Sequence, residues 1–300
     1  MFVLATAGCS EDNAAKDEGN DTAEECVPVF LTGTAINGAS CMQLEDCVSG
    51  FCAVYSHTPT DANGTCQPAP PPGDIHVLGN VRDFMTDELM PNVTIKLGGA
   101  IDISQNPTGY PVAETLTSDA NGLVDAVLTG DATHLILGII AVIEADGYYP
   151  TSTGLAKPSA GCGMYEAGIR NPDLKMMKIT DMNRLSDLLL AGYPALADSL
   201  PLGEKGGVVG LIRDVNSGEA VSGVEIRSAN SASVAQIYYL NGSRDAFTAD
   251  LSSSSGVFVI LNPGMAEEFS AYQNDTIVSR RPATIGETSG ILLTTTVQVE

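Results

Sequence analysis

The stretch GNVRDFMTDELMPNVTI at residues 79–95 returns later in the chain as GLIRDVNSGEAVSGVEI at residues 210–226. Aligned without a gap, the two stretches have the same residue at six of seventeen positions, at a constant offset of 131 residues from Gly79 to Gly210. Further along, Gly122 is matched by Gly256 at an offset of 134, so three residues have been added in between. Self-similarity of this kind predicts two copies of one structural unit.

Each copy has the pattern of β-structure. Val93 and Ile95 alternate with polar residues in the first copy, as Val224 and Ile226 do in the second, which is the period of a half-buried strand. The apolar run LILGIIAVIEA at 135–145 is shorter than the ~20 residues that cross a bilayer, and its β-branched residues predict a buried central strand. With 31 Gly, 16 Pro and no Trp, the composition favours many short strands. We therefore expect a mainly β chain in which each copy buries its own core.

One helix is predicted between the two copies, in DMNRLSDLLLAGY from residue 181. Either Thr180 or Asp181 can act as its N-cap, and Gly192 and Pro194 are expected to end it. Its apolar side chains fall on one face, which predicts packing between the two copies. These residues are Met182, Leu185, Leu188 and Leu189.

Together these features resemble carboxypeptidase regulatory-like domains, a family of transthyretin-like β-sandwiches with about seven strands. In the first copy the resemblance runs from Asp74 through the turn DANG at 119–122 to GYYP at 147–150. The second copy departs at its end, where Arg281-Pro282 stands in place of that last motif. The resemblance implies two tandem sandwiches that are not themselves a peptidase but accompany catalytic or surface modules.

The N-terminus, MFVLATAGCSEDNAAKDEGN, resembles the lipobox of a bacterial lipoprotein. Small residues run into Cys9, although Thr6 stands where that family prefers leucine. Residues 10–25 carry seven acids and one lysine, which suits an extended tether. The resemblance implies that Cys9 is lipidated and anchors the chain in the bacterial cell envelope, and Ser10 after it implies the outer membrane.

Six further cysteines, an even number, allow fifteen disulfide pairings: Cys26, Cys41, Cys47, Cys52, Cys66 and Cys162. The spacing C-x5-C-x4-C-x13-C from residue 41 to 66 resembles small cysteine-rich modules of bacterial surface lipoproteins. Crosslinks are expected, because about forty polar residues cannot form a sufficient core. The alternative is a zinc knuckle using His57, but paired C-x2-C spacing is missing, so we expect no metal. A pairing of Cys26 with Cys162 across domains stays open.

The stiff segment QPAPPPG at 67–73 marks a domain boundary. The expected organisation is a lipoprotein signal remnant with an acidic tether, a cysteine-rich module, a Pro-rich linker, a first β-sandwich, a helix with its connector, and a second β-sandwich. The corresponding ranges are 1–25, 26–67, 68–73, 74–180, 181–205 and 206–300.

Charge and motifs exclude several function classes. A formal net charge of −23 repels phosphate backbones and anionic membrane surfaces, so we expect no nucleic-acid partner and membrane contact only through the N-terminal lipid. The three histidines, His57, His76 and His134, have no glutamate three residues on, as a zinc peptidase would need. A nucleophile elbow, a P-loop and a Rossmann glycine pattern are absent from the sequence too. We expect no enzyme and no cofactor.

The sequence therefore favours a non-catalytic, lipid-anchored envelope protein that displays tandem sandwiches for binding or structural spacing. Its partner would be a polysaccharide or another envelope protein. Exposed aromatic side chains would stack on sugars, and the candidates are Tyr148, Tyr149, Tyr238 and Tyr239, although tyrosine pairs in strands more often have one member buried. The alternative is an accessory or regulatory subunit of a separately encoded envelope hydrolase or secretion system.

Overall fold

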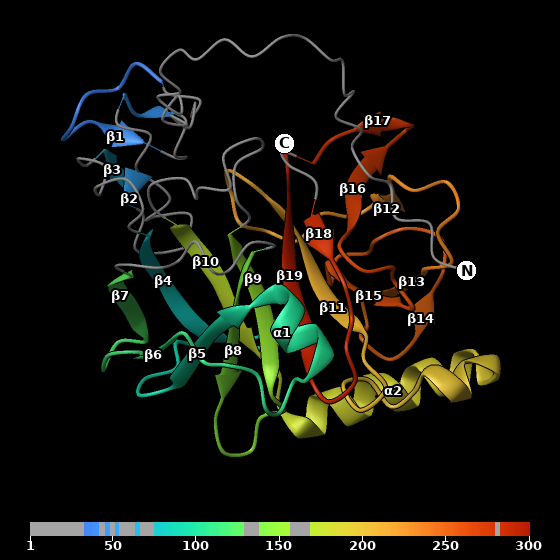
Figure 1. Cartoon of the computed structure of the whole chain (residues 1–300). Helices are drawn as coiled ribbons and strands as arrows, with labels where there is room; N and C mark the ends of the chain where they lie inside the picture. Colours follow the sequence, from blue (N-terminus) through green and yellow to red (C-terminus); the bar gives the residue numbers. More distant parts are fainter. Residues whose placement is uncertain are drawn as a thin grey trace, which may run out of the picture.

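A computed structural model shows strands in several sheets and few helices, which confirms the mainly β expectation (Figure 1). The structure describes residues 33–41, 46–48, 52–53, 64–66, 75–128, 138–156, 169–279 and 283–300. The predictions for Cys9, Cys26, Cys162, His57 and His134 lie outside the described residues, as do those for the tether and the Pro-rich linker.

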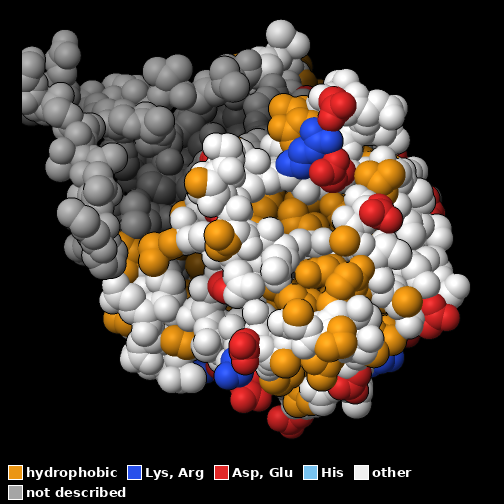
Figure 2. All heavy atoms as spheres, turned by 90° about the vertical axis from the view of Figure 1, so that its right-hand side faces the viewer, with side chains coloured by type: hydrophobic (Ala, Val, Ile, Leu, Met, Phe, Trp, Pro, Cys, Tyr) orange, Lys and Arg blue, Asp and Glu red, His pale blue; other side chains and the backbone are white. Residues whose placement is uncertain are grey.

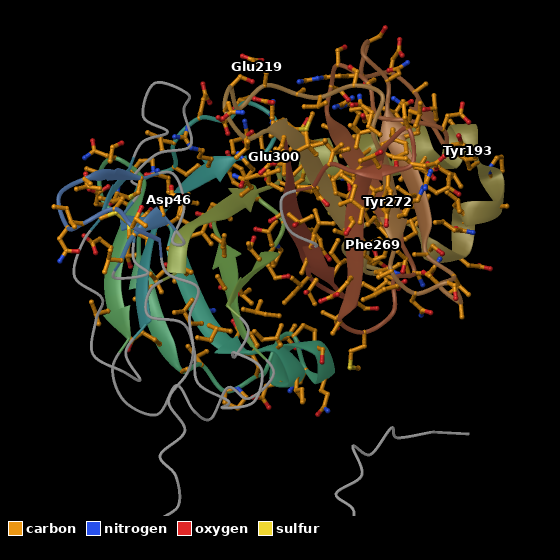
Figure 3. The ribbon with its side chains drawn as sticks, turned by 90° about the horizontal axis from the view of Figure 1, so that it is seen from above. Asp46, Tyr193, Glu219, Phe269, Tyr272 and Glu300 are labelled. Atoms are coloured by element: carbon orange, nitrogen blue, oxygen red, sulfur yellow. A yellow bond between two sulfur atoms is a disulfide. The ribbon has the colours of Figure 1, made fainter. Side chains whose placement is uncertain are left out.

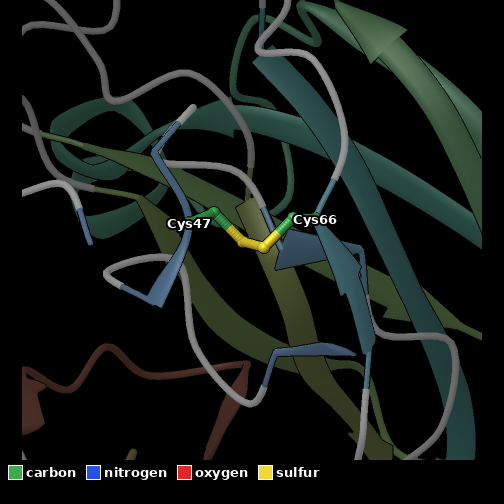
Figure 4. The surroundings of a disulfide bond; sticks show 2 residues. All are labelled: Cys47 and Cys66. Carbon is green, nitrogen blue, oxygen red and sulfur yellow. A yellow bond between two sulfur atoms is a disulfide. The ribbon is translucent and has the colours of Figure 1, made fainter. Parts of the chain in front are cut away.

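The cysteine-rich module contains a small antiparallel sheet with the strand order β1-β3-β2. Its strands are β1 (Ser40–Cys41), β2 (Cys52–Ala53) and β3 (Gly64–Cys66). A disulfide joins Cys47 to Cys66 with the two Cα atoms 5.5 Å apart (Figure 4), and Cys41 is also in a disulfide. All three cysteines are buried. Crosslinks therefore hold this module, and these three sulfurs are not available as the thiolates that zinc requires.

The first repeat is built of two layers of strands. One layer is a three-stranded sheet, β10-β4-β7, and the other is the run β9-β8-β5-β6 of a larger sheet. A cluster of buried Val, Ile and Leu side chains fills the space between them. The strands are β4 (Ile75–Asp83), β5 (Thr94–Gly99), β6 (Glu114–Thr117), β7 (Leu123–Leu128), β8 (Ile139–Glu144), β9 (Thr151–Ala156) and β10 (Ile169–Met176). The predicted buried central strand is β8, which lies between β9 and β5.

The second repeat has the same two-layer plan. One layer contains β14-β13-β15-β11-β19, and the other contains β12-β16-β17 with β18 also paired to β16. A separate cluster of buried apolar side chains lies between them. The strands are β11 (Val208–Asp214), β12 (Glu225–Ser228), β13 (Gln236–Leu240), β14 (Phe247–Thr248), β15 (Val257–Leu261), β16 (Glu267–Gln273), β17 (Thr276–Ile277), β18 (Ala283–Ile285) and β19 (Leu292–Val299).

The repeated sequences build the same turn twice. Asp83 ends β4, and its Oδ1 accepts hydrogen bonds from the backbone N–H groups of the second and third residues after it, at 3.0 and 2.9 Å. Asp214 ends β11 and does the same at 3.0 and 2.7 Å. Four residues after each aspartate the backbone is left-handed, at Asp87 (φ 62°) and Gly218 (φ 70°). The aspartate that occurs in both repeats is thus a turn residue whose side chain satisfies backbone donors.

A single nine-stranded sheet runs through both repeats. The C-terminal strand β19 lies between β11 of its own repeat and β9 of the first repeat, parallel to both (Figure 1). Leu292 and Leu293 are the residues of β19 that pair with Thr151 and Ser152. The two sandwiches are therefore joined by backbone hydrogen bonds as well as by the chain that connects them.

The connecting helix α2 (Ile179–Gly192) is followed by a 3₁₀ helix, η4 (Pro194–Ser199). Met182, Leu185 and Leu189 are buried, as predicted, in a third apolar core. That core is lined mainly by the second repeat but includes Phe84 of the first. The predicted N-cap is wrong. Lys178 occupies the cap position without a side-chain hydrogen bond to the helix, because the chain enters α2 directly from an extended segment.

Candidate functional site: two strand-end clusters

The structure separates the four candidate tyrosines. Tyr239 is 1% exposed, and its hydroxyl oxygen accepts the backbone N–H of Ile226 at 2.7 Å, which ties the two layers of the second repeat together. Burial raises its pKa to about 12. Tyr238 is 8% exposed and lies against the ring of Tyr193 beneath α2, with 4.5 Å between the ring centroids. Neither ring is placed to stack on a sugar.

The first tyrosine pair is divided between a core position and the surface. Tyr149 packs against the third apolar core, where its ring lies over Gly203 and leaves no space for a Cβ at that position. Its neighbour Tyr148 is half-buried and borders a hollow. Of the four candidates, Tyr148 alone lines the hollow that the structure describes.

The hydroxyl of Tyr148 is fixed by a hydrogen bond to a buried carboxylate. It donates to Oδ2 of Asp83 at 3.0 Å, and the same oxygen is 3.3 Å from Nζ of Lys178. Burial alone would raise the pKa of Asp83, but hydrogen bonds from the Thr86 backbone and Tyr148, with the charge of Lys178, together hold it below its usual value. The Lys178 ammonium is 5.9 Å from the centroid of the Tyr148 ring. The ring is therefore oriented before any ligand arrives.

The hollow beside Tyr148 has a volume of about 360 Å³. Its wall combines polar and apolar groups in equal measure, and the lining residues are Thr94, Glu144, Ala145, Asp146, Tyr148 and Pro150. Nζ of Lys96 on β5 is 2.6 Å from a carboxylate oxygen of Glu144 on β8. Of the two carboxylates that line the hollow, Glu144 is therefore already in an ion pair. An oriented ring beside charged groups can contact a molecule that has both C–H faces and hydroxyl groups.

A second group of charged side chains around a tyrosine lies in the second repeat, where the sequence analysis placed no candidate. Nη2 of Arg227 on β12 is 2.6 Å from Glu225 and 2.8 Å from Asp275, and its guanidinium carbon is 4.7 Å from the centroid of the Tyr272 ring on β16 (Figure 3). Arg227 is 131 residues after Lys96. The repeated motif could not predict Tyr272, because this residue lies outside the motif. Tyr272 pairs with Glu225 as Glu144 pairs with Thr94, and only this strand pairing relates the two positions.

A second charged group, next to the first turn, is structural. Lys175 and Arg82 are buried, and both contact the half-exposed carboxylate of Asp87. Burial would raise the pKa of Asp87, but the charges of Lys175, Arg82 and, from the second repeat, Arg213 lower it. This group closes the turn where the two repeats meet.

The face that the second repeat turns away from the first carries hydrophobic side chains across its centre and charged side chains at its rim (Figure 2). Exposed apolar residues on the second repeat include Val234, Leu251, Met265 and Ile277. Among the described residues, none of the helices has the length and apolar character of a membrane span.

Comparison with known proteins gives structural resemblances alone. No protein-family model and no curated protein sequence matches the chain. The shaft pilin spaA from Lactobacillus rhamnosus GG aligns with 76% of this chain and 97% of its own, at 10% identity and a TM-score of 0.21. The Bacillus anthracis TIE protein aligns with 76% of this chain and 34% of its own, at 10% identity and a TM-score of 0.22. Catechol 1,2-dioxygenase from Acinetobacter sp. ADP1 aligns with 37% and 55%, at 16% identity and a TM-score of 0.23. At these scores no functional argument rests on them.

Proposed function

We propose that this chain is a non-catalytic protein of the bacterial cell envelope, anchored by lipid at Cys9, whose two carboxypeptidase regulatory-like sandwiches form one rigid unit for display or spacing. The observation that carries the proposal is the nine-stranded sheet that continues through both repeats. The tether, the disulfide-held module and the tandem sandwiches would then follow one another outward from the anchor.

The continuity of the sheet matters because tandem domains usually move relative to each other unless their interface is large and apolar. Here β19 pairs with a strand of each repeat, and the core beneath α2 contains side chains from both. Close-packed interiors transmit strain without yielding. A unit of this kind suits a protein that holds something at a fixed distance from a membrane.

The two carboxyl groups of the first repeated turn, Asp83 and Asp87, have structural partners. Asp83 is bound by its turn, by Tyr148 and by Lys178, and Asp87 is bound by two cations. A general acid or base needs a pKa near the working pH, whereas the pKa values of both carboxyl groups are lowered from 3.8. These groups stabilise turns.

Metabolic labelling tests the anchor. The full-length gene is expressed in a bacterial host with radioactive palmitate, alongside the variant Cys9→Ser. We expect label in the wild-type chain and recovery in the membrane fraction, with both lost in the variant. Ser10→Ala is the matched control, because it removes a hydroxyl next to the anchor and leaves the cysteine. Equal labelling of wild type and Cys9→Ser, or labelling of neither, would contradict the proposal.

Capture of partners tests the display role. Residues 26–300, produced with disulfides intact, are incubated with envelope polysaccharides and with solubilised envelope proteins, and retained proteins are identified by mass spectrometry. Saturable retention of a polysaccharide or of a non-enzymatic envelope protein is expected. Recovery of a hydrolase or a secretion component in fixed proportion would instead support the accessory-subunit alternative.

A further inference from the structure

The turn between β13 and β14 contains the dipeptide Asn241-Gly242, which has no part in the proposed function. Asparagine followed by glycine is chemically labile, because glycine has no Cβ to keep its backbone nitrogen away from the neighbouring side-chain amide. Three such pairs lie wholly within the described residues, and the other two are Asn37-Gly38 and Asn121-Gly122. Their hydrogen bonds differ in a way that bears on this reactivity.

The backbone nitrogen of the glycine is engaged in two of the three pairs. Gly38 donates its N–H to the carbonyl of Cys66 at 2.7 Å, and Gly122 donates its N–H to the carbonyl of Asp119 at 3.0 Å. Among the described residues, the N–H of Gly242 has no hydrogen-bond partner. A backbone nitrogen must lose its proton to attack a carbon atom, and a hydrogen bond to a carbonyl holds that proton in place. Of the three nitrogens, that of Gly242 is therefore the one free to react.

The side-chain carbonyl of Asn241 has two backbone donors aimed at its oxygen. Oδ1 accepts the N–H groups of Asp245 at 3.0 Å and Ala246 at 3.4 Å, while Nδ2 donates to Oδ1 of Asp245 at 2.8 Å. Donors in this position stabilise the negative charge that develops on the oxygen when a nucleophile adds to the carbonyl carbon. In Asn121, by contrast, the backbone N–H and Nδ2 donate to Asp119, and neither bond supports the side-chain oxygen.

We propose that Asn241 is a site of spontaneous deamidation, which converts this hairpin residue into aspartate and isoaspartate. The nitrogen of Gly242 adds to Cγ of Asn241 and gives its proton to water, while Nδ2 takes up a proton and leaves as ammonia. Water then opens the resulting cyclic imide at one of its two carbonyl groups, so the net reaction consumes water and releases ammonia. Because the reacting groups belong to adjacent residues, no cofactor is needed. The proposal does not depend on the anchored display function.

The modification affects a hairpin that contacts α2. Nη1 of Arg184 in α2 donates to the carbonyl of Arg244 at 2.8 Å, and Phe247, the first residue of β14, is buried in the core beneath α2. A carboxylate at position 241 replaces the amide donor that faces Asp245 with a second negative charge. Isoaspartate also inserts a carbon atom into the main chain of the turn. Both products are expected to loosen the contact between the hairpin and α2.

Heavy-oxygen labelling tests the site. The full chain, with its disulfides intact, is incubated in mildly alkaline buffer made with heavy-oxygen water, then digested and analysed by mass spectrometry, since each deamidation incorporates oxygen from water. The peptides that contain Asn37 and Asn121 are internal controls. A variant, Gly242→Ala, adds a Cβ beside the attacking nitrogen. The matched control is Gly154→Ala, because that glycine follows no asparagine and has open space around its Cβ.

We expect heavy oxygen to enter position 241 of the folded chain about tenfold faster than positions 37 and 121, the factor that one hydrogen bond commonly supplies. In the reduced chain unfolded in urea, the three rates should become similar, because only the local sequence then acts. Gly242→Ala should lose labelling at position 241, and Gly154→Ala should label as the wild type does. A methyltransferase specific for isoaspartate should modify the aged wild type alone among Asn241 peptides of wild type and Gly242→Ala.

Three results would overturn the inference. The first is the absence of heavy oxygen at Asn241 in the folded chain. The second is labelling of Asn37 or Asn121 as fast as Asn241 before unfolding, which would show that the hairpin confers no reactivity. The third is undiminished labelling of Asn241 in Gly242→Ala. The comparison of folded and unfolded wild type keeps the test decisive even where the Gly242→Ala variant does not fold.

Discussion

Ser118 and Ser252 make the same two hydrogen bonds in the two repeats. Oγ of Ser118 accepts the backbone N–H of Val93 at 2.9 Å and donates to a main-chain carbonyl at 2.9 Å. Oγ of Ser252 accepts the N–H of Val224 at 2.9 Å and donates to the equivalent carbonyl at 2.8 Å. Both serines are buried. Each hydroxyl thus links the strand after the repeated turn to the segment that precedes Gly122 or Gly256.

Replacing either serine by alanine should destabilise the protein, because a buried N–H and a carbonyl lose their partner. We expect Ser118→Ala and Ser252→Ala each to lower the free energy of unfolding by about 1–3 kcal/mol. Urea denaturation followed by circular dichroism measures the change. Ser254→Ala, at an exposed position in the same loop, is the control and should change stability little. Equal midpoints for all three variants would show that these bonds are not needed.

Gly210 should not tolerate a side chain. A Cβ at this position would lie 2.1 Å from Cζ of Phe258, whose ring is fully buried in the paired strand. We expect Gly210→Ala to cost about 1–3 kcal/mol through overpacking. Gly154→Ala is the matched control, because that strand glycine has open space around its Cβ. Combining Gly210→Ala with Phe258→Leu should recover part of the loss, and a fully additive double variant would argue against the clash.

The lowered pKa of Asp83 predicts an acid-dependent loss of stability. Because the folded pKa lies below the unfolded value of 3.8, ionised Asp83 stabilises the fold above about pH 4, and this contribution is lost as the pH falls through the folded pKa. Asp83→Asn should lower stability at pH 7 by about 1–3 kcal/mol, since the bond to Lys178 loses its charge. Urea unfolding from pH 7 to pH 3 should show the difference from wild type shrinking. A constant difference would point to geometry instead of charge.

Tyr239 should be a structural residue whose hydroxyl matters. Tyr239→Phe leaves the buried N–H of Ile226 without its acceptor and should cost about 1–3 kcal/mol. Tyr272→Phe, on the exposed side of β16, is expected to change stability little. The pKa gives a second readout, because burial raises the pKa of both Tyr239 and Tyr110 to about 12. In alkaline titration by ultraviolet absorbance, Tyr239→Phe should therefore have one late-ionising tyrosine fewer than the wild type. Ionisation of all tyrosines near pH 10 would contradict this assignment.

Prediction from the sequence worked best where the determinants are local. The alternation of Val93 and Ile95, the turn at Asp83 and the apolar face of α2 each depend on residues close together in the chain. The N-cap prediction for α2 failed because tertiary contacts set the entry of the helix. Tyr148 forms a β-bridge with Lys178, and the carbonyl of Gly147 accepts the backbone N–H of Ile179.

The candidate site was predicted only in part, because its geometry depends on contacts between segments that are distant in the sequence. Tyr148 was one of four candidates chosen because an exposed tyrosine can stack on a sugar. The exposure of Tyr148, Tyr149, Tyr238 and Tyr239 depends on their packing. Tyr272 and Arg227 carry no motif, and their proximity depends on the register of β12 and β16, forty-five residues apart at Arg227 and Tyr272.

The sequence alone determined that the chain is mainly β, that one unit occurs twice, and that cysteines crosslink the module before it, because repeats, alternation and cysteine spacing are written in the order of residues. Only the tertiary structure decided that Cys47 pairs with Cys66 and that β19 joins the two repeats. These depend on contacts between distant segments, such as Leu292 with Thr151. The free energy of such contacts comes from burial and backbone pairing, which local sequence does not specify.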